Sequence, residues 1–174
     1  MRNITDKIYY AGAQADGGFL FENQYEVPNG VTYNSYVIMD EKTAVLDTAD
    51  AKVGEQWLLN LKEILSGKKP DYLVVSHMEP DHAANIGTFL KEFPQAVVVA
   101  NQKTFDILAC YFDIDFSGRS LIVKEGDTLG LGGHTLQFFM APMVHWPEVM
   151  VSYEQKEKIL FSADAFRNFG KTSD

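Results

Sequence analysis

Four side chains of the kinds that bind metal ions lie within six residues, in the segment Ser76-His77-Met78-Glu79-Pro80-Asp81-His82. The segment follows residues 72–75, a continuous apolar run typical of a buried strand, and precedes residues 83–90, whose apolar side chains have helical spacing. It therefore forms a loop between a strand and a helix. In open α/β sheets ligands bind beyond the carboxyl ends of the strands, so His77, Glu79, Asp81 and His82 predict a metal site.

A simpler interpretation of this segment is a solvated polar loop in which Asp81 or His82 caps the following helix. A cap accounts for one acidic residue at the start of a helix. It does not account for His and acidic side chains that alternate along the loop, so the metal-site hypothesis is favoured.

Two more candidate ligands follow strands later in the chain. His145 lies between Pro142 and Pro147, after a predicted strand that ends at Ala141, and Asp164 follows the last predicted strand. Both can occupy strand-end loops on the same side of a sheet. Taken alone, each is an ordinary loop or turn residue, and only the first motif makes them candidates. His134, at the start of a strand, is expected to be exposed to solvent.

The elements that must position these residues follow from hydrophobic periodicity and turn signals. Helices are predicted over residues 53–65, ended by Gly67, and over residues 102–112, with Asn101 as N-cap. Strands are predicted over residues 8–11, 19–21, 31–39, 43–46, 72–75, 96–100, 121–124, 128–131, 135–141, 149–153 and 158–161. Antiparallel strands with helices on the outer faces fit an α+β fold of the αββα sandwich type, although the pattern also allows other α+β folds.

Composition narrows the class of protein. A chain of 174 residues with 46% hydrophobic side chains suits one domain with a substantial core. A net charge of −9 argues against nucleic acid or an anionic membrane as partner. Neither a signal peptide nor a membrane-spanning run is apparent, so a cytoplasmic protein is expected. The single cysteine, Cys110, agrees with a reducing compartment and is expected in the core because it lies in an apolar helical run.

The motif His77-x-Glu79-x-Asp81-His82 resembles the His-x-His-x-Asp-His motif of the metallo-β-lactamase fold, with the middle His replaced by Glu. That replacement is the mark of flavodiiron proteins, also called A-type flavoproteins. The similarity extends to residues 29–36, 46–48 and 161–166. The resemblance implies a metallo-β-lactamase-like domain over residues 1–174 that holds two irons.

The resemblance also assigns ligands to each iron. It implies that His77, Glu79 and His145 bind one iron, that Asp81 and His82 bind the second, and that Asp164 bridges the two. In the family a further His completes the second iron, and no His follows His145 in this chain. The second iron is therefore expected to be weak or absent.

As activity, the resemblance implies reduction of nitric oxide to nitrous oxide, of oxygen to water, or of both. In the family the electrons come from FMN on a flavodoxin-like domain of the partner subunit in a head-to-tail homodimer. A rubredoxin-like or flavin donor supplies that FMN. Glu79 and Trp146 are expected to face this cofactor, with Trp146, Met78 and Met143 in an apolar wall around the irons.

Two other functions remain open: a dizinc hydrolase of the metallo-β-lactamase superfamily, and a truncated metal-binding module without turnover. Glu79 favours iron over zinc because Glu79, Asp81 and Asp164 bring three negative charges, which suit iron in its higher oxidation state. The missing late His favours the truncated module.

The resemblance further implies a C-terminally incomplete fold with an uncovered apolar sheet face. Part of a set that alternates along three strands would form it: Phe138, Met140, Val149, Val151, Ile159 and Phe161. Because monomers rarely expose large apolar patches, we expect that the chain is not a self-sufficient monomer.

Overall fold

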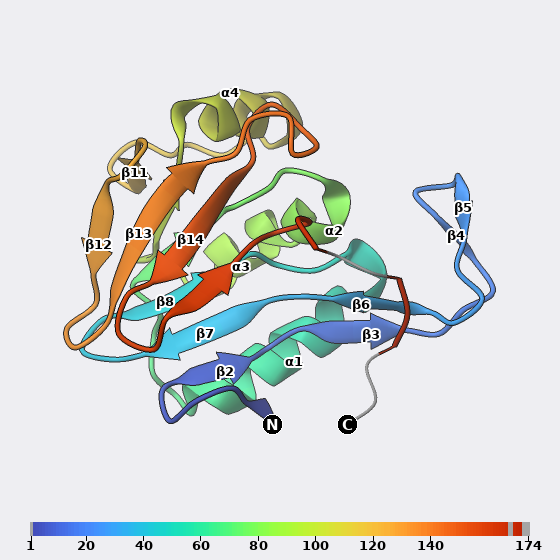
Figure 1. Cartoon of the computed structure of the whole chain (residues 1–174), viewed down its shortest axis with the longest axis horizontal. Helices are drawn as coiled ribbons and strands as arrows, with labels where there is room; N and C mark the ends of the chain where they lie inside the picture. Colours follow the sequence, from blue (N-terminus) through green and yellow to red (C-terminus); the bar gives the residue numbers. More distant parts are fainter. Residues whose placement is uncertain (1, 167–168, 172–174) are drawn as a thin grey trace.

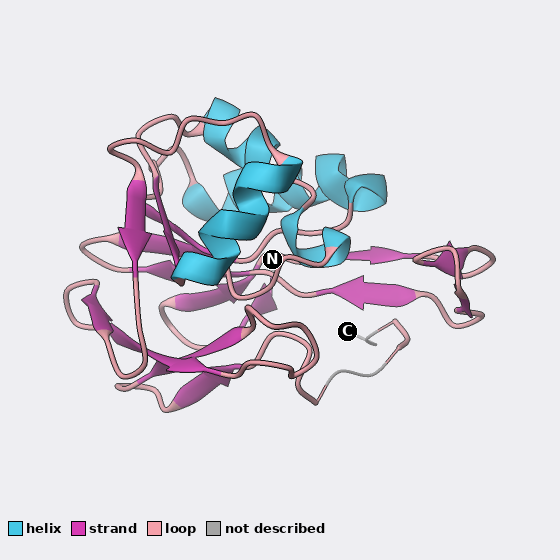
Figure 2. Cartoon of the chain, turned by 90° about the horizontal axis from the view of Figure 1, so that it is seen from above, coloured by secondary structure: helices cyan, strands magenta, loops and turns pink. Residues whose placement is uncertain are grey.

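The computed structural model describes residues 2–166 and 169–171 of the chain. Three layers are stacked: helices, a seven-stranded sheet and a four-stranded sheet (Figures 1 and 2). The helices cover one face of the larger sheet, and the smaller sheet packs on its other face. This arrangement confirms the α+β prediction. Within the described residues no helix covers the outer face of the smaller sheet, and none is long and apolar enough to cross a bilayer.

The larger sheet is mixed, and its parallel half positions the predicted site. Its strand order is β1 (Arg2–Asn3), β2 (Ile8–Tyr10), β7 (Tyr36–Met39), β8 (Thr43–Leu46), β9 (Tyr72–Val74), β10 (Val97–Ala100) and β11 (Ser120–Ile122). From β8 to β11 neighbouring strands are parallel, and the others are antiparallel. The carboxyl ends of β8, β9 and β10 therefore meet at one edge.

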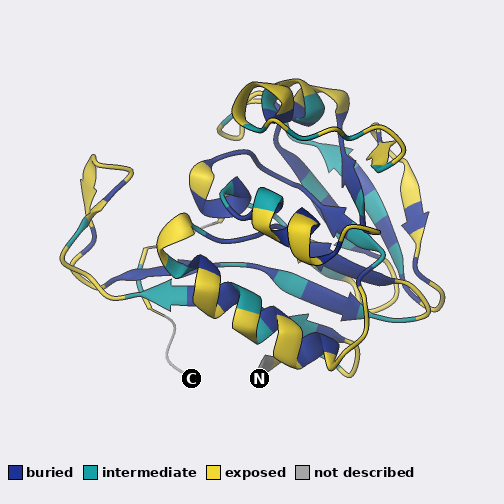
Figure 3. Ribbon diagram, turned by 180° about the vertical axis from the view of Figure 1, so that it is seen from behind, coloured by how far each residue is buried: buried dark blue, intermediate teal, exposed yellow. Residues whose placement is uncertain are grey.

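Helices connect the parallel strands and cover one face of the larger sheet (Figure 3). They are the 3₁₀ turn η1 (Ala51–Val53), α1 (Gly54–Leu65), α2 (Pro80–Ala83), α3 (Ile86–Glu92) and α4 (Gln102–Tyr111). On α1 the buried residues Trp57, Leu61 and Leu65 recur every four positions and face the sheet. Asn101 caps α4 by accepting a hydrogen bond from the Thr104 N–H, as predicted.

The smaller sheet is a meander of antiparallel hairpins: β12 (Thr128–Gly130), β13 (Thr135–Met140), β14 (Met150–Glu154) and β15 (Ile159–Phe161). Alternation along the strands produces two cores. On β9, Leu73 packs among the helices, whereas Val74 packs against the smaller sheet. Phe138 and Met150 enter the core between the sheets from the other side and are fully buried.

A two-stranded ribbon projects beyond the sheets (Figure 1). It consists of β3 (Ala13–Ala15) paired with β6 (Val31–Tyr33), and it ends in a hairpin of β4 (Leu20–Phe21) and β5 (Tyr25–Glu26). Residues 169–171 lie along this ribbon, where the Lys171 N–H donates to the Asn29 carbonyl (3.1 Å) and Phe169 packs edge-on against Phe21. Residues 169–171 thus stabilise the ribbon through these two contacts.

The single strand predicted over residues 31–39 is wrong, because Asn34 and Ser35 interrupt it. The Ser35 hydroxyl donates to the Asp47 carbonyl (2.9 Å), and its own carbonyl accepts from Ala11 N–H. These bonds divert the chain from the ribbon into the larger sheet. A continuous apolar run in the sequence does not show that its two halves pair with strands of different sheets.

The burial predicted for Cys110 and the solvent exposure predicted for His134 are also wrong. Cys110 is exposed rather than buried, because α4 buries Thr104 and Leu108 and a residue two positions further points away from that face. His134 is only 1% exposed. Its backbone N–H and its Nδ1 both contact Asp40 Oδ2, at 2.8 and 2.7 Å, so the turn between β7 and β8 covers the ring.

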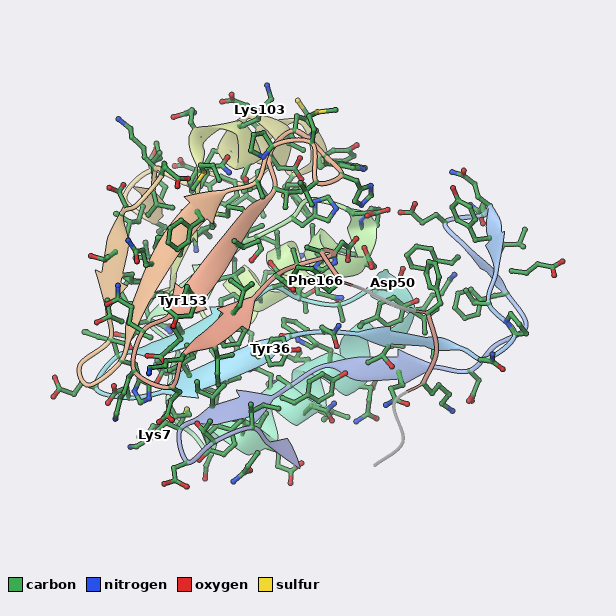
Figure 4. The ribbon with its side chains drawn as sticks, viewed as in Figure 1. Lys7, Tyr36, Asp50, Lys103, Tyr153 and Phe166 are labelled. Carbon is green, nitrogen blue, oxygen red and sulfur yellow. The ribbon has the colours of Figure 1, made fainter. Side chains whose placement is uncertain are left out.

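The predicted uncovered face also needs correction. Phe138 and Phe161 are buried between the sheets, so they do not belong to it. Register places Val151 opposite Phe139 and Tyr153 opposite Leu160 on the outer face, and Leu160 is 48% exposed. In Figure 4 Tyr153 is labelled on β14. The outer face is only partly apolar, with Gln137 opposite Tyr153, and its residues are largely different from those expected.

Substitutions on β13 test this orientation. Phe138→Ala is expected to lower the free energy of unfolding by about 3–5 kcal/mol, because it leaves a cavity in a closed core. Phe139→Ala, at the neighbouring position on the half-buried outer face, should cost much less. Denaturant unfolding measures both. A larger loss of stability for Phe139→Ala would mean that Phe139, and not Phe138, faces the core between the sheets.

Candidate metal centre

The motif segment turns from β9 into α2 at the carboxyl edge of the larger sheet. His77 follows the strand, and Glu79 occupies the N-cap position of α2, with Pro80 as the first helical residue. Asp81 and His82 fall within α2 itself. Thr48, just after β8, pins this helix through its N–H and hydroxyl, which both donate to the His82 carbonyl (2.8 and 2.6 Å).

A first group of potential ligands gathers around Glu79. Its Oε2 lies 3.1 Å from His77 Nε2 and 2.9 Å from His145 Nε2. Asp164 Oδ2 lies 3.3 Å from the same His145 nitrogen. One ligand atom from each of these four residues lies within 4.8 Å of all the others. His145 comes from the β13–β14 loop and Asp164 from the loop after β15, so both sheets contribute.

A second group shares Asp164 with the first. Its Oδ1 lies 2.9 Å from His82 Nε2, which is also 3.8 Å from Asp81 Oδ2. Ligand atoms of Asp81, His82 and Asp164 lie within 4.8 Å of one another. The two oxygens of Asp164 thus face different groups. The structure brings all six predicted ligands together, and this arrangement fits a pair of ions with a bridging carboxylate.

Buried carboxylates fix the two central imidazoles. His77 Nδ1 lies 2.7 Å from Glu148 Oε1, which also accepts from the Met78 N–H. His82 Nδ1 lies 3.2 Å from Asp47 Oδ2, and the other oxygen of Asp47 accepts from the Ser76 N–H. A carboxylate at Nδ1 holds the proton there and leaves the Nε2 lone pair for a metal.

The buried carboxylates in this region favour a positive charge beside them. Burial lowers the pKa of His77, but hydrogen bonds to Glu148 and Glu79 outweigh it and raise that pKa to about 9. Burial also opposes protonation of His82, yet hydrogen bonds to Asp164 and Asp47 raise its pKa well above the usual value. Protons on the rings balance the carboxylates, and a metal ion displaces such protons when it binds.

A cavity of about 500 Å³ opens onto the first group. Its walls are Phe21, Glu22, Gln24, Tyr25, Glu79, His145, Trp146, Asp164 and Phe169. The Trp146 ring lies edge-on to the His77 ring, with centroids 5.3 Å apart. Figure 4 labels Phe166 and Asp50, which lie on the loops after β15 and β8 at this edge.

Trp146 lines this cavity as expected, but the two methionines do not. The Met78 side chain is buried, and Met143 is 72% exposed. Because Met78 follows His77 directly in the loop, its side chain turns away from the ligands and into the helix-side core. The expectation for Met78 and Met143 is therefore wrong.

Sequence reasoning missed two residues of the site. Glu148 contacts His77 across 71 positions of the chain, and Glu22 reaches the centre from the ribbon hairpin. Partial burial, together with a hydrogen bond and the charge of Glu79, raises the pKa of Glu22 to about 7. The sequence does contain one signal for Glu148. It is an acidic residue directly before the apolar residues Val149 and Met150, at the point where a predicted strand enters the core.

Stacked sheets with His and carboxylate side chains gathered on strand-end loops are the architecture of a metallo-β-lactamase-like domain. The chain belongs to the family described as "ODP family beta lactamase", whose family model matches residues 31–174.

Sequence and structure comparisons agree with this assignment. The chain is 41% identical over 172 residues to a nitric oxide reductase of Moorella thermoacetica, covering 98% of this chain and 43% of that protein. The crystal structure of a flavodiiron protein from Giardia intestinalis superposes with a TM-score of 0.92 at 31% identity, over 99% of this chain and 42% of that one.

Rubredoxin oxygen:oxidoreductase from Desulfovibrio gigas gives a TM-score of 0.91 at 32% identity, over 99% of this chain and 43% of that one. The expected similarity to flavodiiron proteins and the metallo-β-lactamase-like fold are confirmed. The chain spans about two fifths of the length of these relatives.

The contact between Glu148 and His77 gives the first test of the centre. Glu148→Gln is expected to weaken metal binding about 10- to 100-fold, because the ring loses the carboxylate that sets its tautomer. Glu63→Gln, an equal charge change on the exposed side of α1, is the control. Metal titration followed by calorimetry measures both. Unchanged affinity in Glu148→Gln would remove this carboxylate from the site.

The raised pKa of His77 gives a test by pH. Because the pKa is higher in the folded protein (about 9) than the ordinary 6.5, the metal-free fold gains stability that is complete below pH 6.5. That contribution is lost as the pH rises toward 9. The Tm of metal-free protein should therefore fall across this window, and less steeply in His77→Gln. A Tm that rises there in the wild-type protein would contradict the assignment.

Proposed function

We propose that residues 1–174 form the diiron domain of a flavodiiron reductase of nitric oxide, oxygen or both. In this proposal His77, Glu79 and His145 bind one iron, Asp81 and His82 bind the other, and Asp164 bridges them. One observation carries the proposal: all six side chains converge from three separate segments of the chain, with each imidazole Nε2 facing carboxylate oxygens. The names of the relatives support it.

The donor set favours iron over zinc. The first group combines two imidazoles with two carboxylates, and Asp81 adds a third carboxylate to the second group. Anionic oxygen donors stabilise a metal in its higher oxidation state, and zinc has no such state. Glu79 carries this argument, because a histidine there would remove one of the three negative charges.

A pair of irons held by these six side chains would supply one electron each, which suits reduction of two nitric oxide molecules, with two protons, to nitrous oxide and water. Oxygen reduction to two water molecules needs four electrons and four protons. We propose that FMN on a flavodoxin-like domain, with a rubredoxin-like or flavin donor behind it, supplies further electrons. A head-to-tail homodimer would bring that FMN to the cavity beside Glu79 and Trp146.

The residues of this chain hold the centre and limit its access to water. Glu148 and Asp47 fix the imidazole tautomers, and the buried motif loop keeps Glu79 and Asp81 from solvent. Trp146 forms an apolar wall against the His77 ring. Restricted access of this kind protects reactive species from side reactions with water.

Metal analysis separates the proposed ligands from other histidines. Glu79→Ala should empty the iron that it shares with His77 and His145, because both a bond and a compensating charge are lost. His134→Ala should keep its metal content, although it lowers stability because the His134 side chain is buried against Asp40. Mass spectrometry of the metals after anaerobic loading measures both variants. Equal iron loss would show that the site is misplaced.

The two groups should differ in affinity for iron. The first has four ligands, whereas the second has Asp81, His82 and the shared Asp164. Titration with Fe(II) should therefore show one tight and one weak binding event. Two equally tight irons would contradict this ligand assignment, and zinc at full occupancy with no iron after expression would favour the hydrolase.

Activity tests the proposal itself. Protein loaded anaerobically with Fe(II) is mixed with a reduced flavodoxin domain, and the consumption of nitric oxide and of oxygen is followed with gas electrodes. At least one gas should be consumed faster than by Glu79→Ala that has been treated with Fe(II) in the same way. Bound iron without any consumption would support the module without turnover.

A further inference from the structure

Glu22 lies at the tip of the ribbon hairpin in an unfavourable backbone conformation. The turn closes with a hydrogen bond from the Gln24 N–H to the Phe21 carbonyl (3.0 Å), and Glu22 and Asn23 have φ of 52° and 59°. Two positive φ values define a type I′ turn, which favours Asn and Gly in these positions. Glutamate is disfavoured in this turn, and this strain draws attention to what its side chain contacts.

That side chain reaches the candidate metal centre. Glu22 lines the cavity of about 500 Å³ together with Glu79, His145 and Asp164. It also lines a neighbouring cavity of about 470 Å³, whose wall includes Lys52. Glu22 thus lines both cavities, shares the first with the proposed ligand Glu79, and is exposed to solvent at the same time.

Most of the proposed ligands are buried, whereas His145 is exposed beside the same cavity. His77 is 0%, Asp81 3% and Glu79 4% exposed. A hydrated cation must shed water before it reaches them, and a carboxylate at the cavity mouth can replace that water one ligand at a time. Clefts lined by charges of one sign also raise the local concentration of the opposite ion.

We propose that Glu22 is a loading ligand, which takes a divalent iron ion from solvent and passes it to Glu79. The inference rests on the metal centre proposed above. Among the described residues Glu22 is absent from both groups whose ligand atoms lie within 4.8 Å of one another. That absence separates a transient ligand at the mouth from a permanent ligand of the centre.

The test measures how fast metal binds and how much remains bound. Anaerobic stopped-flow absorbance follows Co(II) alone, an optically visible probe for Fe(II), as it enters metal-free wild-type protein, Glu22→Gln and Glu26→Gln. Gln keeps the size and shape of Glu22 but cannot act as an anionic ligand. Glu26 is the matched control, because it lies on the same hairpin, is exposed and does not line the cavity.

Glu22→Gln should load about tenfold more slowly than wild type and reach the same final metal content, whereas Glu26→Gln should load at the wild-type rate. Equal rates in the two variants would overturn the proposal. A lower final metal content in Glu22→Gln would also overturn it, because Glu22 would then be a permanent ligand. If wild-type protein bound no metal, the proposed diiron centre itself would fail, which is a distinguishable result.

Discussion

Buried negative charge at one edge of the larger sheet is the constraint on which the rest of the structure depends. Glu79, Asp81 and Glu148 lie within or beside the motif loop with almost no exposure. Carboxylates so close to one another are tolerated only with positive charge between them. In the metal-free protein, protons on His77 and His82 supply that charge, which explains their raised pKa values. Metal ions would replace those protons.

The fold serves this constraint by delivering groups to a single edge from elements that are far apart in the chain. Parallel β8 and β9 place Asp47 beside the start of the motif loop, where the Ser76 N–H donates to Asp47 Oδ1 (2.6 Å). The smaller sheet adds His145, Glu148 and Asp164. Its attachment at the same edge includes the Met150 N–H bond to the Ser76 carbonyl (3.1 Å). Packing of the two sheets therefore sets the ligand geometry.

The sequence predicted the parts of this site that are local. Ligands within a six-residue loop, flanked by an apolar run and a helical stripe, indicate a strand-to-helix site without any tertiary information. His145 and Asp164 are ordinary loop residues by themselves, and only the first motif made them candidates. Glu148 and Glu22 act through contacts with distant segments, which leave no periodic signal. The same limitation explains His134, whose burial depends on Asp40 in another turn.

The central claim is that iron binds between His77, Glu79, His145 and Asp164. Diffraction at the iron absorption edge, from crystals of the chain loaded anaerobically with Fe(II), tests it most directly. The account predicts a strong anomalous peak at the centre of these four side chains, with a weaker peak beside Asp81 and His82. A peak elsewhere, or no peak at full iron excess, would contradict it.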